Sequence, residues 1–124
     1  MTITLDTGAL IALERRDLRM RRLLILAARD RETLVVPTVV LGEWWRGRSD
    51  LRDEIVEAVV IERLDAELAK RAGEALAVVR GATFVDAVVM ASAASRGDVV
   101  YTSDPDDLIR LHAHFRGVRR VLAV

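Results

Sequence analysis

The chain has 124 residues, enough for one domain with its own hydrophobic core, and we treat residues 1–124 as a single domain. It contains no cysteine, which excludes disulfides, zinc–thiolate sites and cysteine nucleophiles. Its 19 basic residues balance its 19 acidic residues, so net charge does not indicate a nucleic-acid partner. Charged residues interrupt every apolar run, so we expect no signal peptide, no membrane contact and a cytoplasmic protein.

Short apolar strands alternate with helices along the chain. In order, the pattern predicts a strand at 3–5, helices at 9–15 and 17–31, a strand at 34–36, helices at 37–47 and 49–58, a strand or helix end at 59–61, helices at 65–80 and 84–95, a strand at 99–102, a helix at 105–114 and a strand at 119–124. Such alternation is typical of a parallel sheet covered on both faces. We therefore expect an α/β fold, a three-layer α/β/α sandwich around a central parallel sheet of about 4–5 strands.

The helix at 17–31 has two contrasting faces. We assign its apolar face to Leu23, Leu24, Leu26 and Ala27. The other face, together with the end of the preceding helix, is rich in arginine: Arg15, Arg16, Arg19, Arg21 and Arg22. Such a surface is either simply solvated or contacts phosphate groups, and the sequence leaves both readings open.

Two adjacent tryptophans, Trp44 and Trp45, follow Glu43 in the helix at 37–47. Neighbouring helix positions point about 100° apart, so both side chains cannot face the same core. We expect one tryptophan to be a core residue and the other to be free to contact a partner or stack on a base.

The helix at 84–95 is apolar on nearly every side, which predicts the central buried helix of the fold. Asp86 lies in its first turn. A carboxylate at the mouth of a buried helix needs a partner, because an unpaired charge there is costly.

Four carboxylates are the candidate site residues, and each also has a purely structural explanation. Asp6 ends the first strand, where its side chain could cap the next helix. Glu43 could be an ordinary solvated helix residue. Thr83-x-x-Asp86 matches a capping box, and Asp104 precedes a proline, as helix N-cap residues often do.

Taken together, the four carboxylates indicate a metal site. Asp6 and Asp104 both follow strands, and sites in open parallel sheets form beyond the carboxyl ends of the strands. Carboxylates gathered without a cation repel one another and raise each other's pKa values, and no lysine lies nearby in the sequence. A hard divalent cation such as Mg²⁺ or Mn²⁺ resolves this conflict, since it prefers oxygen ligands.

Four stretches resemble the motifs of a known family. They are ITLDTGAL at 3–10, VLGE at 40–43, FVDA at 84–87 and TSDPDDL at 102–108. In their order and spacing, and in total length, the whole chain resembles the PIN domains, and among them the VapC toxins of bacterial toxin–antitoxin pairs.

This resemblance implies a PIN-like fold and a Mg²⁺- or Mn²⁺-dependent endoribonuclease that leaves a 5′-phosphate and a 3′-hydroxyl. The catalytic residues, which would hold one or two metal ions and position the attacking water, would be Asp6, Glu43, Asp86 and Asp104. Supporting contacts would come from Thr102, Ser103 and Asp107.

The resemblance also implies partners. These are an RNA substrate, a VapB-type antitoxin packed on an apolar groove near the first helices, and a second copy of the chain in a homodimer. The residues we consider for RNA or antitoxin contact are Trp44, Trp45, Arg15, Arg19 and Arg22.

The sequence is also compatible in outline with three other kinds of protein. A non-catalytic PIN-fold RNA-binding or scaffolding protein would be expected to lose acidic residues, and this chain keeps all four. A phosphoacceptor domain needs an acidic pair after the first strand and a late lysine, but Leu5 precedes Asp6 and Lys70 lies mid-chain. A haloacid-dehalogenase-like phosphatase needs an aspartate where Gly8 stands. We expect His112 and His114 to be surface residues, and the sequence does not identify the RNA.

Overall fold

The computed structural model describes residues 1–124, and at its centre is a five-stranded sheet in which all neighbouring strands are parallel. The strands are β1 (Thr2–Leu5), β2 (Thr33–Pro37), β3 (Val60–Glu62), β4 (Val99–Thr102) and β5 (Arg120–Ala123). Their order across the sheet is β3-β2-β1-β4-β5. The segment at 59–61, which the sequence left open, therefore contributes an edge strand.

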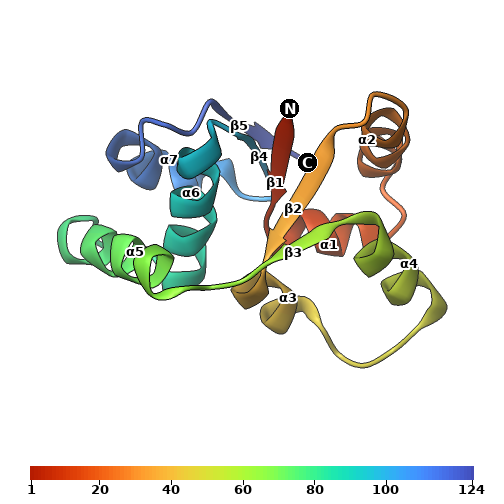
Figure 1. Ribbon diagram of the computed structural model, residues 1–124, viewed down its shortest axis with the longest axis horizontal. Helices are drawn as coiled ribbons and strands as arrows, with labels where there is room; N and C mark the ends of the chain where they lie inside the picture. The colour runs from red at the N-terminus through yellow and green to blue at the C-terminus, as the bar shows by residue number, and fades with distance from the viewer.

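Seven helices cover the two faces of this sheet. They are α1 (Thr7–Glu14), α2 (Leu18–Arg29), α3 (Thr38–Trp44), α4 (Asp50–Ala58), α5 (Ala66–Val78), α6 (Phe84–Arg96) and α7 (Pro105–His114). Figure 1 shows α1, α2 and α4 on one side of the sheet and α5, α6 and α7 on the other, with α3 near its lower end. The predicted α/β/α sandwich is confirmed. None of the helices combines the length and the apolar character needed to cross a bilayer.

Side-chain caps fix where several helices begin. Asp17, Ser49, Asp65 and Thr83 each accept a hydrogen bond from the backbone N–H three residues further on. These bonds satisfy donors that have no partner inside the helix. The cap expected at Thr83 is confirmed.

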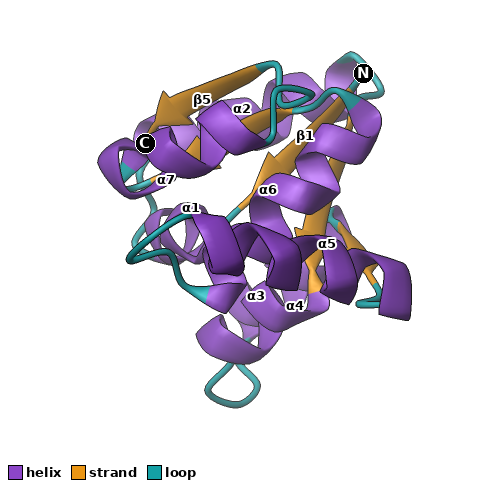
Figure 2. Ribbon diagram, turned by 90° about the vertical axis from the view of Figure 1, so that its left-hand side faces the viewer, coloured by secondary structure: helices purple, strands orange, loops and turns teal.

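Helix α6 is the central buried helix, as its composition predicted. Seven consecutive residues, 87–93, are at most 1% exposed. Figure 2 shows α6 in front of β1 with α5 and α7 to either side, so neighbours surround it. Gly97 ends the helix in the left-handed conformation, at φ +73°.

The apolar face of α2 differs from the expectation in one residue. Leu26 was assigned to that face, but it is 38% exposed. The face is formed instead by Met20, Leu23, Leu24 and Ala27, of which Met20 and Ala27 are fully buried. These four follow the i, i+3, i+4, i+7 spacing of one helix face, whereas Leu26 lies about 100° away from Ala27.

The strand order creates a crevice between β1 and β4. The chain leaves β1 toward β2 and β3, and later returns to place β4 on the opposite side of β1. Leu5 pairs with Tyr101, and the Asp6 N–H donates to the Tyr101 carbonyl at 3.2 Å. Ligand sites in open parallel sheets lie at the carboxyl ends of strands where the order reverses. Here that position is the region just beyond Leu5 and Thr102.

Candidate metal centre

A small polar cleft of about 150 Å³ lies at this position. Carboxylates and hydroxyls dominate its lining, and it contains neither a cation nor an apolar side chain. The lining residues are Asp6, Thr7, Gly8, Glu43, Asp86, Thr102, Ser103, Asp104 and Asp107. The structure thus brings together all four predicted carboxylates and all three predicted supporting residues.

Asp6 forms the buried floor of the cleft, since it is only 7% exposed. Its Oδ1 accepts the Ala9 N–H at 2.9 Å, so Asp6 also caps α1, as its structural explanation required. Burial raises the pKa of the Asp6 carboxyl, and the nearby charge of Asp86 raises it further. Hydrogen bonds from Thr102 and from the backbone oppose this rise but do not cancel it.

Asp104 lies on the loop between β4 and α7. It occupies the N-cap position of α7, yet its side chain makes no capping hydrogen bond. Its backbone N–H donates to the buried Thr102 hydroxyl at 3.0 Å, which shapes the turn. The expected capping hydrogen bond is therefore absent. The exposed carboxylate of Asp104 is available to bind an ion in the cleft.

Asp86 and Asp107 approach the cleft from α6 and α7. Partial burial raises the pKa of Asp86, and the Thr83 hydroxyl at the start of α6 partly offsets this. The negative charges of Asp107, Glu43 and Asp104, in decreasing order, raise it further. Asp107 is therefore one of the carboxylates whose negative charges repel one another in the cleft.

Glu43 is an exposed residue of α3, but its side chain is held in place. The Thr7 hydroxyl donates to Glu43 Oε1 at 2.5 Å, which joins α3 to the first turn of α1. An ordinary solvated helix residue would not need such a hydrogen bond, so the contact argues against that explanation of Glu43.

The donor set fits a hard divalent cation, because every side chain that lines the cleft offers oxygen and none is positively charged. In the arrangement observed, no three acidic or histidine side chains are close enough to hold one ion. Like charges without a cation repel one another, so a spread arrangement is expected of the ion-free chain. Ion binding would require these side chains to turn toward one another.

Comparison with known proteins identifies the family. The PIN domain model matches residues 3–113, which is most of the chain. The chain belongs to the PIN domain family. No curated protein sequence matches it.

Solved structures that share this fold include two crystal structures. One is a chain in the crystal structure of VapBC2 from Rickettsia felis bound to a DNA fragment from their promoter; it has a TM-score of 0.76 and 14% sequence identity, over 100% of this chain and 99% of that one. The other is the crystal structure of PAE2754 from Pyrobaculum aerophilum, with a TM-score of 0.61 and 21% identity over 100% and 92% of the two chains.

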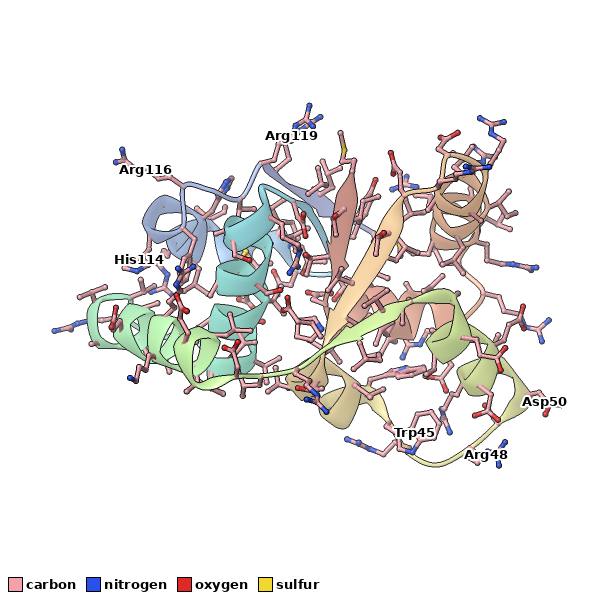
Figure 3. The ribbon with its side chains drawn as sticks, in the orientation of Figure 1. Trp45, Arg48, Asp50, His114, Arg116 and Arg119 are labelled. Atoms are coloured by element: carbon pink, nitrogen blue, oxygen red, sulfur yellow. The ribbon has the colours of Figure 1, made fainter.

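The two tryptophans of this PIN domain have different environments, as the sequence predicted. Trp44 is 4% exposed and donates its indole N–H to Glu14 at 2.9 Å, so it is a core residue. Trp45 is half-buried and packs edge-on against Trp44, with ring centroids 6.1 Å apart. Figure 3 shows Trp45 at the start of the loop that leads toward Arg48. Contact with RNA or antitoxin therefore remains a hypothesis for Trp45 alone.

The arginines of α1 and α2 lie outside the cleft. Arg15, Arg19 and Arg22 are exposed, in agreement with both readings that the sequence left open. Arg119 lies at the opposite end of the sheet, beside Met1 (Figure 3). His112 is half-buried and bonds the Val118 carbonyl at 2.9 Å, whereas His114 is exposed; neither lines the cleft.

Two cleft residues, Thr7 and Gly8, are not among the candidate site residues that the sequence indicated. Thr7 donates to Glu43, and Gly8 lies so close to Ser103 that a Cβ at position 8 would be 1.9 Å from Ser103 Oγ and 2.6 Å from its Cβ. The sequence feature that could have indicated their role is a hydroxyl residue and a glycine placed directly after a carboxylate that ends a strand.

An apolar groove of about 410 Å³ lies on the side of the sheet covered by α1, α2 and α4. Seven of its ten lining residues are hydrophobic, and the charged ones are two arginines and a glutamate. They are Leu13, Arg16, Arg21, Leu24, Ile25, Ala28, Leu51, Glu54, Ile55 and Ala58. Ile25 is 66% exposed, so part of this surface is open to a partner.

Proposed function

We propose that this PIN domain, residues 1–124, is a Mg²⁺- or Mn²⁺-dependent endoribonuclease and the toxin of a VapBC-like type II toxin–antitoxin system, acting in the cytoplasm. The observation that carries the proposal is the convergence of five carboxylates, from four separate parts of the chain, on one cleft without a cation. PIN domains are in general nucleases, and the fold shared with a VapBC2 chain supports the narrower assignment.

Asp6, Glu43, Asp86 and Asp104 would hold the ion, with Asp107 next to Asp86. When bound, a divalent cation lowers the pKa of coordinated water and stabilises charge on a phosphodiester. Asp6 is the most firmly held of these carboxylates, because it is buried and accepts a hydrogen bond from the Ala9 N–H. Asp86, Asp104 and Asp107 are more exposed and can adjust as the substrate arrives, whereas Glu43 is held by the Thr7 hydroxyl.

In the proposed reaction, water attacks phosphorus and the bond from phosphorus to the 3′-oxygen breaks. The products are a 5′-phosphate and a 3′-hydroxyl, and one proton of the water passes to the leaving oxygen through solvent or a carboxylate. The reaction needs no side-chain nucleophile, and the cleft holds no histidine that could activate the hydroxyls of Thr7, Thr102 or Ser103. Substrate phosphates would be attracted to the exposed arginines at 15, 19 and 22, and Trp45 could stack on a base.

We further infer that a VapB-type antitoxin binds the groove between α2 and α4. Its apolar floor suits the apolar face of a helix, and Arg16, Arg21 and Glu54 at the groove suit a partner segment with complementary charges. The VapBC2 structure supports this type of partner for a chain of this fold. A homodimer is part of the same proposal.

The test is induced expression in a bacterial host, followed by mapping of new 5′ ends in total RNA. The wild type is compared with Asp6→Asn/Asp86→Asn, and with Asp30→Asn/Asp50→Asn as a control in which both changes lie outside the cleft. We expect growth arrest and discrete cuts with the wild type and the control only. The purified proteins should reproduce these cuts with Mg²⁺ or Mn²⁺ and lose them in EDTA.

Arrest caused equally by the Asp6→Asn/Asp86→Asn variant would contradict the nuclease proposal. It would favour a PIN domain that binds RNA or serves as a scaffold without cutting. Cleavage that persists in EDTA would contradict the metal-dependent mechanism.

A further inference from the structure

The hydroxyl of Thr7 is the single hydrogen-bonding partner of the Glu43 side chain. Thr7 is the first residue of α1 and directly follows Asp6. Its Oγ1 donates to Glu43 Oε1 at 2.5 Å across 36 positions of the sequence. No ion pair within 4.0 Å involves Glu43, although the chain carries 19 basic residues.

We propose that Thr7 is a positioning residue for metal binding: its hydroxyl holds one oxygen of Glu43 and leaves the other for the ion. This inference rests on the proposed function, since it assigns a role at the same cleft. Thr7 itself contacts neither the ion nor the scissile phosphate in this account.

Glu43 needs such a partner for two physical reasons. An exposed glutamate has three flexible side-chain torsions, and ordering them costs entropy each time an ion binds. Glu43 and Asp86 also line the same cleft, which contains no cation, so their negative charges repel one another. Without a restraint, Glu43 would turn toward solvent.

Threonine is well suited to provide that restraint. Branching at Cβ limits its χ1 torsion in a helix to about two rotamers, so the hydroxyl has few directions in which to point. The backbone there is fixed in turn, because Asp6 is paired with Tyr101 and caps α1. The first turn of α1 therefore anchors two candidate ligands, Asp6 through the chain and Glu43 through the hydroxyl.

The experiment measures Mn²⁺ binding without RNA, by calorimetry and by electron paramagnetic resonance. Thr7→Val removes the hydroxyl and keeps the shape, whereas Thr7→Ser keeps the hydroxyl. Thr33→Val is the matched control, because Thr33 is exposed, makes no side-chain hydrogen bond and begins β2, at the end of the strand opposite the cleft. We expect Thr7→Val to weaken binding about tenfold, as loss of an outer-shell partner typically does, and the other two variants to stay near the wild type.

A double-mutant comparison separates positioning from a general structural effect. In a Glu43→Ala background, Thr7→Val should leave Mn²⁺ affinity unchanged, because the hydroxyl then has nothing to hold. An equal loss in both backgrounds would overturn the proposal, and so would wild-type affinity in Thr7→Val. If Thr7→Val melts early, the Thr7→Ala and Thr7→Ser variants make the same comparison.

The outcomes also separate this proposal from the proposed function. If the wild type binds Mn²⁺ and cuts RNA while Thr7→Val has normal affinity, only the role of Thr7 is wrong. If Thr7→Val raises the KM for RNA without changing Mn²⁺ affinity, the hydroxyl contacts substrate and the proposal fails. If the wild type binds neither Mn²⁺ nor Mg²⁺, both the role of Thr7 and the metal-dependent function are wrong.

Discussion

Asp107 of α7 is the neighbouring charge that most raises the pKa of Asp86 of α6. The two residues lie 21 positions apart in sequence, on helices that pack side by side. Their interaction means that the acidic cluster extends beyond the four carboxylates that the motifs indicated. It also provides a direct way to measure how strongly the cluster is coupled.

Replacing Asp107 with asparagine should lower the pKa of Asp86 in the ion-free protein, because the largest repelling charge is removed. Carboxyl-resolved NMR titration measures this change. Asp106→Asn is the matched control, since Asp106 is adjacent and exposed but does not line the cleft. A larger shift with Asp106→Asn than with Asp107→Asn would show that the cluster is arranged differently.

Asp86→Asn should make the ion-free protein more stable at neutral pH. The pKa of Asp86 is raised in the folded state, so the folded chain binds its proton more tightly than the unfolded chain. Stability is then lost as the pH rises from the unfolded value of 3.8 through the folded value. The gain is expected to be a few degrees at most, because Asp86 is only partly buried and water screens its neighbours.

Thermal unfolding in EDTA between pH 3 and pH 8 checks this expectation. The melting temperatures of the wild type and Asp86→Asn should converge at low pH, where both carry a neutral side chain. Added Mg²⁺ should raise the melting temperature of the wild type more than that of the variant. A wild type that is the more stable protein at pH 7 in EDTA would contradict the prediction.

Gly8→Ala should destabilise the fold by about 1–3 kcal/mol, the usual cost of an extra methyl group in a tightly packed place. The new Cβ would overlap Ser103 Oγ and Cβ, and the displaced turn would carry Asp104 away from Asp6. Adding Ser103→Gly removes both of those atoms and should restore much of the loss. The restoration is expected to be incomplete, because the Ser103 backbone nitrogen would still lie 2.9 Å from the Cβ.

Urea denaturation gives the stability of the single and double variants, and calorimetry with Mn²⁺ shows whether the cleft recovers. Ser103→Gly alone serves as the control for the change at that position. A Gly8→Ala protein with wild-type stability would mean that the turn has more room than the structure indicates.

Ile25→Asp should abolish antitoxin binding without unfolding the protein. Ile25 lines the groove but is 66% exposed, so the change costs little burial within the chain itself. The measurement is co-purification of this chain with a co-expressed VapB-type protein, the partner proposed above. Ile109→Asp is the control, since Ile109 is 60% exposed on α7 on the other side of the sheet. Loss of binding with Ile109→Asp alone would place the partner on the other side.

Much of the fold could be predicted because local signals agree with it. β-branched runs form β2 and β4, Thr83 and Gly97 begin and end α6, and the apolar character of α6 indicated its central position. The fine assignment of α2 failed at Leu26, because the six consecutive apolar residues 23–28 leave several possible faces. Local pattern does not determine which face packs inward when a helix is apolar over most of a turn.

The carboxylates of the candidate site could be predicted from the sequence, but the contacts between its residues could not. Asp6 and Asp104 follow strands, which indicates an end of the sheet but not that β1 and β4 are neighbours. The bond from Thr7 to Glu43 and the approach of Gly8 to Ser103 depend on that tertiary arrangement. At Asp104 the local sequence was misleading instead. It matches a helix N-cap, but the capping hydrogen bond from the side chain does not form.

The pairing of β1 with β4 has a consequence for the synthesis of the protein on the ribosome. β1 is the first strand to leave the ribosome, whereas β4 and the turn with Asp104 and Asp107 are among the last segments to be made. β1 can pair early with β2, but the acidic cleft stays incomplete until nearly the whole chain has emerged. If the chain is a ribonuclease, it cannot cut the message or the ribosome that is producing it during most of its own synthesis. Under the proposed function, the strand order thus delays RNA cleavage until a finished molecule can meet the proposed antitoxin.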